Sequence, residues 1–198
     1  MLLSNGYFDV PVGKVAAVVT SLEMFSRPEL RKERSEASWK LGRVQRPEPD
    51  WFRSLYGRVG ENWLWFSRLQ MPKAELEALI QHPAMEHYAL HCENADEGLI
   101  ELDFRQEGVC ELSFFGVTAK FIGSGAGRWL MNRAMEIAWS RPIKRFWVHT
   151  CTFDHPAALN FYIRSGFRPF RRQIEIADDP RLVGILPRTD TPQIPIIE

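Results

Sequence analysis

The alternation of apolar and polar positions predicts that strands and helices share the core of this chain. A β-branched apolar run within Val10–Met24 predicts a buried strand near the N-terminus. The runs His87–Glu93, Leu99–Phe104 and Val109–Val117 are separated by short turn sequences, and together they predict an antiparallel meander. A sheet therefore forms the centre of the predicted fold.

Helical periodicity and breaker residues define the segments before the meander. We expect a helix in the charged segment Arg27–Trp39, a loop or break over Gly42–Asp50, and a second helix with Asp50 as its cap. The aromatic segment Trp63–Ser67 is compatible with a strand or with a loop packed on the core. In Lys73–Gln81 the apolar residues share one face, which predicts a third helix.

The C-terminal half continues the alternation of helix and strand. Arg128–Trp139 has helical periodicity, and Arg145–Thr150 predicts a strand. A helix then begins with Asp154 or His155 as its cap, and Phe167–Ile176 predicts a last strand.

Composition narrows the classes of function. Lys+Arg and Asp+Glu number 25 each, so the formal net charge is zero, and we expect no nucleic-acid partner held by a strong overall basic field. Three cysteines without Cys-x-x-Cys spacing argue against a disulfide framework or a zinc ribbon, and favour a reduced, cytoplasmic setting. We see no signal-peptide pattern and no apolar stretch long enough for a membrane span, so we expect no membrane partner.

The length of 198 residues favours a single domain over residues 1–198. The tail, residues 178–198, is rich in proline and is expected to extend over the surface. A homodimer would follow if this tail crosses to a neighbouring molecule.

A glycine-rich loop, Gly123–Arg128, follows an apolar strand and opens a helical segment. Glycines let the backbone approach a ligand closely, and the first N–H groups of a helix have no partner within it. Such a loop binds phosphate or pyrophosphate, although a tight turn of small residues explains the same sequence. It is not a Walker A loop, because no Lys follows Gly127. A Rossmann fingerprint is also disfavoured, because Arg128 occupies its last glycine position and a meander precedes the loop.

Two coupled motifs make Gly108–Phe167 resemble the GNAT acetyltransferase superfamily. Phe121–Met131 is similar to the family's Arg/Gln-x-x-Gly-x-Gly/Ala loop, with Ile122 where Arg or Gln is usual. Asp154–Phe167 is similar to the family's helix that ends Ala-x-x-x-Tyr-x-x-x-Gly-Phe. The order and separation of the two motifs also match the family.

The resemblance implies an α/β fold with a mixed, mainly antiparallel sheet splayed between the fourth and fifth strands, Val109–Val117 and Arg145–Thr150, and flanked by helices. It also implies a cofactor-binding core over about residues 85–176 and acetyl-CoA as the acyl donor. The pantetheine arm would bind the backbone of Phe115, Gly116 and Val117 like an added strand. The pyrophosphate would lie on the N–H groups of Gly123, Ser124, Gly125, Ala126, Gly127 and Arg128. Gly116 within an apolar strand independently suits a bulge or a close backbone approach.

Acyl transfer to an amine requires that an ammonium group with a pKa near ~10 lose a proton, and the leaving thiolate benefits from an acid. The resemblance implies that Tyr162 is this acid and that it also contacts the cofactor; the alternative is a core tyrosine. Glu111 is the leading base, and period 2 puts Ser113 and Phe115 on its face. The oxyanion would accept a hydrogen bond from the N–H of Phe115 or Val117 at the strand bulge.

Other residues compete for these roles or for a different chemistry. Rivals of Glu111 as base are Glu23, Glu93 and His149. His87 and His91 share a strand face without a third ligand, so we expect no metal. Cys151 has no His/Asn arrangement that would support a thiol nucleophile. Trp63, Trp65 and Phe66 form either a wall of the acceptor pocket or part of the core.

We therefore expect an N-acetyltransferase that moves an acetyl group from acetyl-CoA to a primary amine on a small molecule or a peptide, by direct attack in a ternary complex. Two other hypotheses stay open. One is a non-catalytic CoA-binding sensor or interaction module on the same fold. The other is a nucleotide-binding protein that uses the glycine loop.

Overall fold

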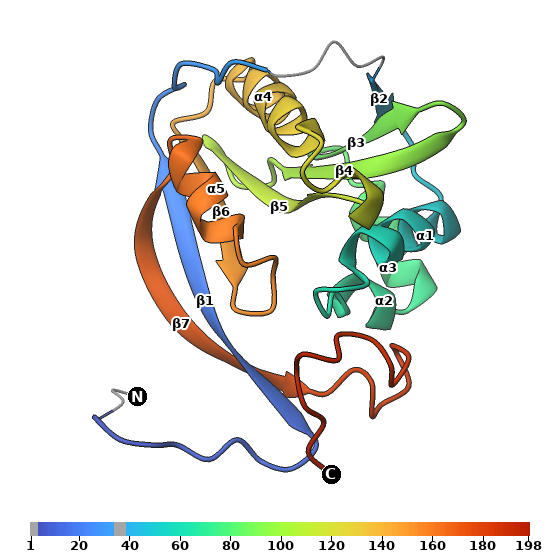
Figure 1. The fold of residues 1–198 in the computed structure, drawn as a ribbon. Coiled ribbons are helices and arrows are strands. Elements are labelled where there is room, and N and C mark those ends of the chain that lie inside the picture. The colour runs from blue at the N-terminus through green and yellow to red at the C-terminus, as the bar shows by residue number, and fades with distance from the viewer. Residues whose placement is uncertain (1–3, 34–38) are drawn as a thin grey trace.

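A computed structural model describes residues 4–33 and 39–198, and Figure 1 shows a twisted sheet with helices packed against it. Its strands are β1 (Lys14–Met24), β2 (Lys40–Val44), β3 (Met85–Cys92), β4 (Ala95–Asp103), β5 (Val109–Val117), β6 (Arg145–Cys151) and β7 (Arg168–Asp178). Its helices are α1 (Pro49–Gly60), α2 (Ser67–Gln70), α3 (Lys73–Ile80), α4 (Ala126–Trp139) and α5 (Ala158–Arg164), with a 3-10 turn at Ala119–Phe121.

The seven strands lie in the order β2-β3-β4-β5-β6-β1-β7. Strands β3, β4 and β5 form the predicted antiparallel meander. Strands β5 and β6 run parallel, and their pairing extends only from Val109 opposite Arg145 to Leu112 opposite Val148. Beyond this point β5 stays paired with β4, and β6 stays paired with β1. The sheet therefore splays open between β5 and β6, as expected and as Figure 1 shows.

Two hydrophobic layers cover the two faces of the sheet. On one face, α4 and α5 pack on alternate residues of the strands, among them Leu112 and Val148. On the other face, α1 and α3 pack on β3 and β4 through a cluster that includes Phe52, Tyr56 and Leu99. Burial of such side chains is the main favourable term in folding. Among the described residues, β6 and β1 contribute to the first of these layers, whereas the side chains of β7 are almost all exposed.

The N-terminal part of the prediction needs two corrections. Residues 27–33 of the expected helix Arg27–Trp39 have no regular secondary structure, and residues 34–38 lie outside the described residues. Strand β2 occupies the start of the expected loop Gly42–Asp50 and pairs with β3. Because of this additional strand, the splay lies between the fifth and sixth strands of the chain, although the two segments are those predicted. The charged residues of this region contact α4 instead of forming a helix; Asn132, for example, donates to the carbonyl of Arg31.

The expected helix after Asp50 is present as α1, but Glu48 rather than Asp50 is the N-cap residue. The aromatic segment Trp63–Ser67 is mainly a loop, with Ser67 beginning α2. A buried packing position explains the aromatic character of this loop, since the Trp65 ring contacts both Tyr56 and Phe114.

The Pro-rich tail folds back on the chain rather than extending over the surface. Arg181 is 3 % exposed and forms an ion pair with Asp179. Its Nη1 also donates to the carbonyl oxygens of Asp190, Thr191 and Ile194. The side chain of Gln193 donates to the carbonyl of Asn62, which ties the tail to the loop after α1. The hydrogen bonds of the buried Arg181 guanidinium group therefore hold this segment together in place of regular secondary structure.

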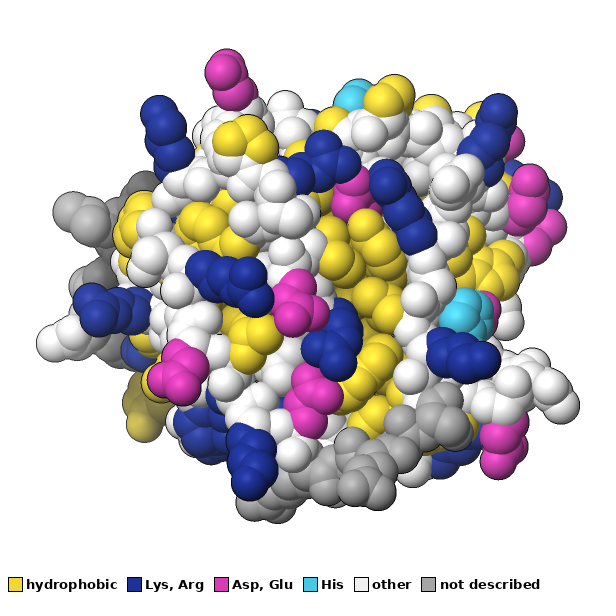
Figure 2. All heavy atoms as spheres, turned by 90° about the horizontal axis from the view of Figure 1, so that it is seen from above, with side chains coloured by type: hydrophobic (Ala, Val, Ile, Leu, Met, Phe, Trp, Pro, Cys, Tyr) yellow, Lys and Arg dark blue, Asp and Glu magenta, His cyan; other side chains and the backbone are white. Residues whose placement is uncertain are grey.

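The surface carries charges of both signs. On the face that Figure 2 shows, Lys and Arg side chains alternate with Asp and Glu side chains, and a band of hydrophobic side chains lies exposed between them. Among the described residues, no helix is long and apolar enough to cross a membrane.

Candidate active site

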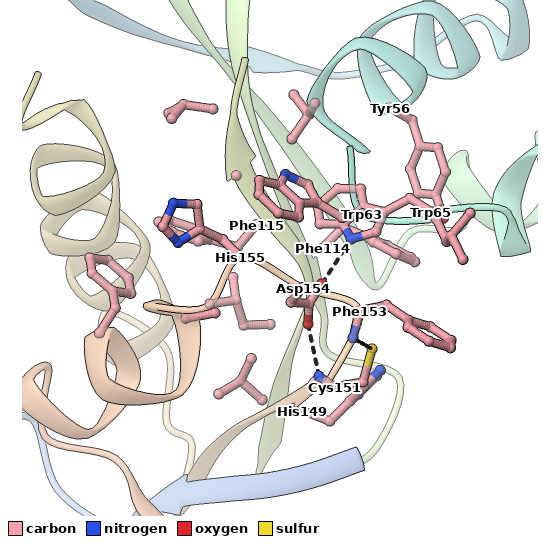
Figure 3. A pocket seen from close by; sticks show the side chains of 18 of the residues that line it. Tyr56, Trp63, Trp65, Phe114, Phe115, His149, Cys151, Phe153, Asp154 and His155 are labelled. Atoms are coloured by element: carbon pink, nitrogen blue, oxygen red, sulfur yellow. Dashed lines mark hydrogen bonds between the residues drawn. The ribbon is translucent and has the colours of Figure 1, made fainter. Parts of the chain in front are cut away.

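A cavity of about 350 Å³ lies where β5 and β6 separate, and we call it the splay cavity. Of the residues predicted for the site, those that line it are Phe115, Gly116, Val117, Gly123, Gly127 and Tyr162. The other predicted residues, which lie outside this lining, are Glu111, Ser124, Gly125, Ala126 and Arg128. Segments that are far apart in the sequence thus meet at one opening of the sheet, which Figure 3 shows from close by.

The free edge of β5 forms one wall of the splay cavity. From Ser113 to Val117 this strand has no pairing with β6, while its other edge stays on β4. Strand edges with free N–H and C=O groups accept an extended ligand as an added strand. Gly116 lies in this stretch because α1 and the following loop approach it closely. A Cβ at this position would lie 2.6 Å from Cγ1 of Val59.

The bulge of β5 lies at Ser113, three residues before Gly116. Glu101 pairs with Phe114 and Leu102 pairs with Leu112, which leaves Ser113 as the extra residue. A bulge reverses the alternation of faces. Phe115 therefore packs into the same layer as Leu112, and the expectation that Glu111 shares a face with Phe115 is wrong.

The glycine loop presents free backbone donors next to the cavity. Gly123 and Gly125 have φ angles of 83° and 97°, a region that favours glycine. The N–H groups of Ser124 and Ala126 are used within the loop, by the Phe121 carbonyl and by Ser124 Oγ. Four backbone N–H groups of this loop donate to no other described residue. They belong to Gly123, Gly125, Gly127 and Arg128. Free donors at the N-terminus of the 14-residue helix α4 suit an anion.

Arg128 has a different orientation from the one predicted for phosphate pairing. Its Nη1 donates to the carbonyl of Lys32 at 3.0 Å, so the guanidinium group lies against the N-terminal segment. Its Nε is buried without a partner among the described residues. The backbone N–H of Arg128, which donates to no described residue, is thus the group available to an anion.

Tyr162 projects from α5 into the splay cavity and is 7 % exposed. Its ring packs against those of Phe115, Phe161 and Phe167. Burial raises the pKa of Tyr162 far above its ordinary value, and the negative charge of Asp154 raises it further. The phenol therefore keeps its proton near neutral pH and can donate it.

Glu111 and His149 form a pair at the rim of the cavity. His149 Nδ1 lies 3.4 Å from Glu111 Oε1. A hydrogen bond to Glu111 raises the pKa of His149, against the opposing effect of burial. His149 lines the cavity whereas Glu111 lies behind it. The pair therefore presents an imidazole, rather than a carboxylate, to a molecule in the cavity.

Asp154 is a site residue that the sequence analysis treated only as a helix cap. Helix α5 begins later, with Ala157 as N-cap, and Asp154 instead lines the cavity. Its carboxylate accepts hydrogen bonds from Thr150 Oγ1 at 2.7 Å and from the Cys151 N–H at 2.9 Å. It also accepts one from Trp65 Nε1 at 3.1 Å, across the opening of the sheet (Figure 3). The available sequence signal was a carboxylate just after a strand end.

Trp63, Trp65 and Phe66 all line the splay cavity, so they are wall residues as well as packing residues. The Trp63 ring lies 5.1 Å from the imidazole of His155, a second contact across the opening. Together with the Trp65–Asp154 hydrogen bond, this contact connects the loop after α1 to the loop after β6. The two halves of the sheet are thus bridged by side chains where their backbones have separated.

The remaining candidates are disfavoured by their partners, their place in the fold or their pKa. Glu23 binds Arg145 at 2.7 Å, and Glu93 lies in the turn between β3 and β4 with a φ of 56°. Cys151 lines the cavity, but burial raises the pKa of its thiol to about 12, so it is a poor nucleophile. His87 pairs with Glu101, and His91 pairs with Asp96.

Comparisons with known proteins agree with this architecture. A family model described as the acetyltransferase (GNAT) family matches residues 61–167, more than half of the chain. A search of curated proteins found no match. A functionally unknown conserved protein from Staphylococcus epidermidis has a similar solved structure, with 13% identity and a TM-score of 0.60 over 84% of this chain and 63% of that one.

Two further structures share the fold. A GCN5-related N-acetyltransferase from Sphaerobacter thermophilus has 12% identity and a TM-score of 0.60 over 82% of this chain and 52% of its own. An aminoglycoside acetyltransferase from an uncultured soil metagenomic sample has 18% identity and a TM-score of 0.53 over 65% of this chain and 87% of its own. The chain thus spans 52% to 63% of the length of the first two structures. At such identities these likenesses show the fold alone.

Proposed function

The chain belongs to the GNAT acetyltransferase family, and we propose that it transfers an acetyl group from acetyl-CoA to a primary amine by direct attack in a ternary complex. One observation carries this proposal. The free edge of β5, the start of α4 and the hydroxyl-bearing ring of Tyr162 line a single cavity. A donor that is held along the strand and at the helix N-terminus would thus have its reactive end beside a neutral phenol.

The residues present fit acetyl-CoA. The free N–H groups of Gly123, Gly125, Gly127 and Arg128 suit its pyrophosphate, and the unpaired edge over Phe115–Val117 suits the amide groups of its pantetheine arm. When bound, acetyl-CoA supplies the acetyl group as a thioester, whose carbonyl carbon accepts the amine nitrogen as the thiolate leaves. N–H groups on the free edge of β5 would donate to the developing oxyanion.

Tyr162 would be the proton donor at the end of the reaction. Its raised pKa keeps the Oη proton in place, so the neutral phenol would donate a hydrogen bond to the thiolate as the C–S bond breaks, and the thiolate would be protonated through this hydrogen bond or by solvent. The ring is held by three aromatic neighbours, which fix the direction of the hydroxyl. Positioning of this kind is a large part of enzymatic rate enhancement.

The base would be the Glu111–His149 pair, with Glu111 acting through His149. His149 lines the cavity, and its Nε2 would take a proton from the ammonium group, directly or through water. Glu111 holds Nδ1 and stabilises the imidazolium that forms. Its effect is to raise the pKa of His149. A raised pKa makes the neutral imidazole a stronger base.

Calorimetric titration with acetyl-CoA, beside ATP and NAD, is the first test. We expect micromolar binding of acetyl-CoA alone. Folded protein that does not bind acetyl-CoA would overturn the proposal, and preferential binding of ATP or NAD would favour a nucleotide-binding protein instead.

The second test separates a catalyst from a CoA-binding sensor. Amine-dependent release of the CoA thiol is measured for the unmodified protein and for Tyr162→Phe, which keeps the ring but lacks the hydroxyl. We expect the variant to lose turnover by about 10²-fold or more while its affinity for acetyl-CoA stays unchanged. Acetyl-CoA binding without thiol release for any amine would support the sensor.

A further inference from the structure

The side chains that line the splay cavity indicate which kind of acceptor it suits. Ten aromatic residues line the cavity as a whole. Among its described lining residues the carboxylates are Asp154 and Glu175, and no lysine or arginine is present. A site with carboxylates, aromatic faces and no lysine or arginine suits a positively charged ligand and disfavours an anionic one.

The carboxylate of Asp154 can accept one more hydrogen bond. An ionised carboxylate offers about four lone-pair positions. Three are used by Thr150, Cys151 and Trp65. Oδ2 accepts from the first two donors, whereas among the described residues Oδ1 accepts from Trp65 alone. An ammonium group that donates to Oδ1 would complete the carboxylate without displacing a partner.

The position of Asp154 also fits the chemistry. Its charge raises the pKa of both Tyr162 and His149, so it lies within electrostatic reach of the two groups proposed for proton transfer. All three residues line the splay cavity, so an amine bound at Asp154 would share this cavity with its proposed acid and base. The same carboxylate is reached by an indole N–H from the opposite wall, which places it among the aromatic rings (Figure 3).

We propose that the acceptor is a primary amine with a single positive charge and an apolar, aromatic body, and that its ammonium group binds Asp154 between Trp63, Trp65, Phe114 and Phe153. This inference rests on the proposed acetyl transfer for its biological meaning. Cation–π attraction to the two indoles adds to the ion pair. Glu175, the second carboxylate among the described lining residues, is exposed on β7, whereas Asp154 lies beside the indole of Trp65. The aromatic surroundings of Asp154 therefore favour an apolar body over a polycation.

The test compares three amines in the thiol-release assay with acetyl-CoA. 2-Phenylethylamine has the proposed features, phenylalanine adds a carboxylate to the same body, and kanamycin is a polycation. We expect kcat/KM for 2-phenylethylamine to exceed both other values by about tenfold or more. A preference for kanamycin or phenylalanine would overturn this inference while leaving acetyl transfer in place.

The residue is tested by Asp154→Asn, which keeps the shape but removes the charge. We expect the KM for 2-phenylethylamine to rise by about tenfold or more, with the KM for acetyl-CoA unchanged. Asp178→Asn removes the same charge from an exposed position on β7 and should leave both values unchanged. An unchanged amine KM in Asp154→Asn would overturn the assignment.

A purely structural role of Asp154 predicts a different result for Thr150→Val. This variant removes one of the hydrogen bonds that fix the loop but keeps the carboxylate. We expect its amine KM to change less than about threefold; an effect as large as that of Asp154→Asn would show that only the loop matters.

Binding of 2-phenylethylamine, measured by calorimetry without acetyl-CoA, gives a readout that does not depend on turnover. We expect binding to the unmodified protein and at least tenfold weaker binding to Asp154→Asn. Binding without turnover would separate a failure of the proposed function from a failure of this inference, and equal affinities or no binding would overturn the inference itself.

Discussion

Two Glu–His pairs lie on the same face of the sheet, yet their surroundings differ. His87 Nε2 lies 3.2 Å from Glu101, and both side chains are at most 1 % exposed. Arg68 completes this cluster with a 2.6 Å contact to the other carboxylate oxygen. In the second pair, His149 is 45 % exposed and Glu111 is 23 % exposed. Within the described residues no arginine or lysine binds Glu111.

The two pairs differ in whether helices enclose them and in whether an arginine binds the carboxylate. Helices α1 and α3 and the Phe52 ring enclose the first pair, which becomes a closed ionic cluster. The described helices of this layer pack on no residue of β6, and His149 of the second pair lines the splay cavity. A closed pair resists proton exchange with a ligand, while an open pair can take part in it. Residue type alone therefore does not assign a catalytic role.

We call His87–Glu101 the closed pair and Glu111–His149 the open pair. The largest effect is expected at the closed pair. Glu101→Gln leaves Arg68 without its buried counter-charge, and we expect a loss of about 3–5 kcal/mol in the free energy of unfolding. Glu111→Gln should cost less than about 1 kcal/mol, because the open pair is partly solvated. Urea unfolding with an unchanged m-value measures both. Similar losses in the two variants would contradict the comparison.

The next effect is expected in turnover at the open pair. Glu111→Gln removes the main cause of the raised pKa of His149, so the acidic limb of the pH–rate profile should move to lower pH. The maximal rate should fall by about tenfold to 100-fold, because the imidazolium loses its partner. Thiol release over a pH series measures both changes. A lower rate with an unmoved acidic limb would mean that Glu111 acts only on structure.

A smaller effect is expected in acid stability. Burial tends to raise the pKa of Glu101, but the hydrogen bond from His87 and the charge of Arg68 outweigh it, so the pKa is lowered. A lowered carboxyl pKa contributes stability that is present above the ordinary value of 4.5 and is lost as the pH falls through the folded-state pKa. Unfolding midpoints between neutral and acidic pH should therefore fall less steeply in Glu101→Gln. Parallel pH profiles would count against this role.

The raised pKa of His149 has the opposite effect on the pH dependence of stability. Its contribution to stability is present below the ordinary value of 6.5 and is lost as the pH rises through the folded-state pKa. We expect this contribution to be small because the side chain is 45 % exposed. His149→Gln should reduce the loss of stability as the pH rises above 6.5, as measured by thermal unfolding. If the stability of His149→Gln depends on pH in parallel with that of the unmodified protein, His149 does not make this contribution.

The smallest effect is expected from salt. The Debye length falls from about 8 Å at 0.15 M to about 3 Å at 1 M ionic strength, so the open pair is screened and the closed pair is not. In 1 M salt the acidic limb of the rate profile should move toward lower pH by a few tenths of a unit. The stability difference between the unmodified protein and Glu101→Gln should stay nearly constant. If salt changed the acidic limb of the rate profile and the stability difference equally, this would contradict the difference in burial between the open and the closed pair.

Local sequence determined much of this molecule. The meander, the glycine loop and the helix that carries Tyr162 follow from alternation, turn residues and glycine positions, each of which acts over a few neighbouring residues. The order of these elements also identified the family and therefore the splay. The segment of residues 27–33 was misjudged because its charged side chains contact α4, which is distant in the sequence.

Tertiary structure decided which side chains reach the cavity. The bulge at Ser113 depends on the pairing of β5 with β4, so period 2 along one strand could not reveal that Phe115 leaves the face of Glu111. Asp154 and Trp65 are 89 positions apart and meet because β5 and β6 separate. Local sequence thus fixes backbone conformation through short-range sterics and hydrogen bonding, whereas burial, charge and access to the cavity depend on long-range packing.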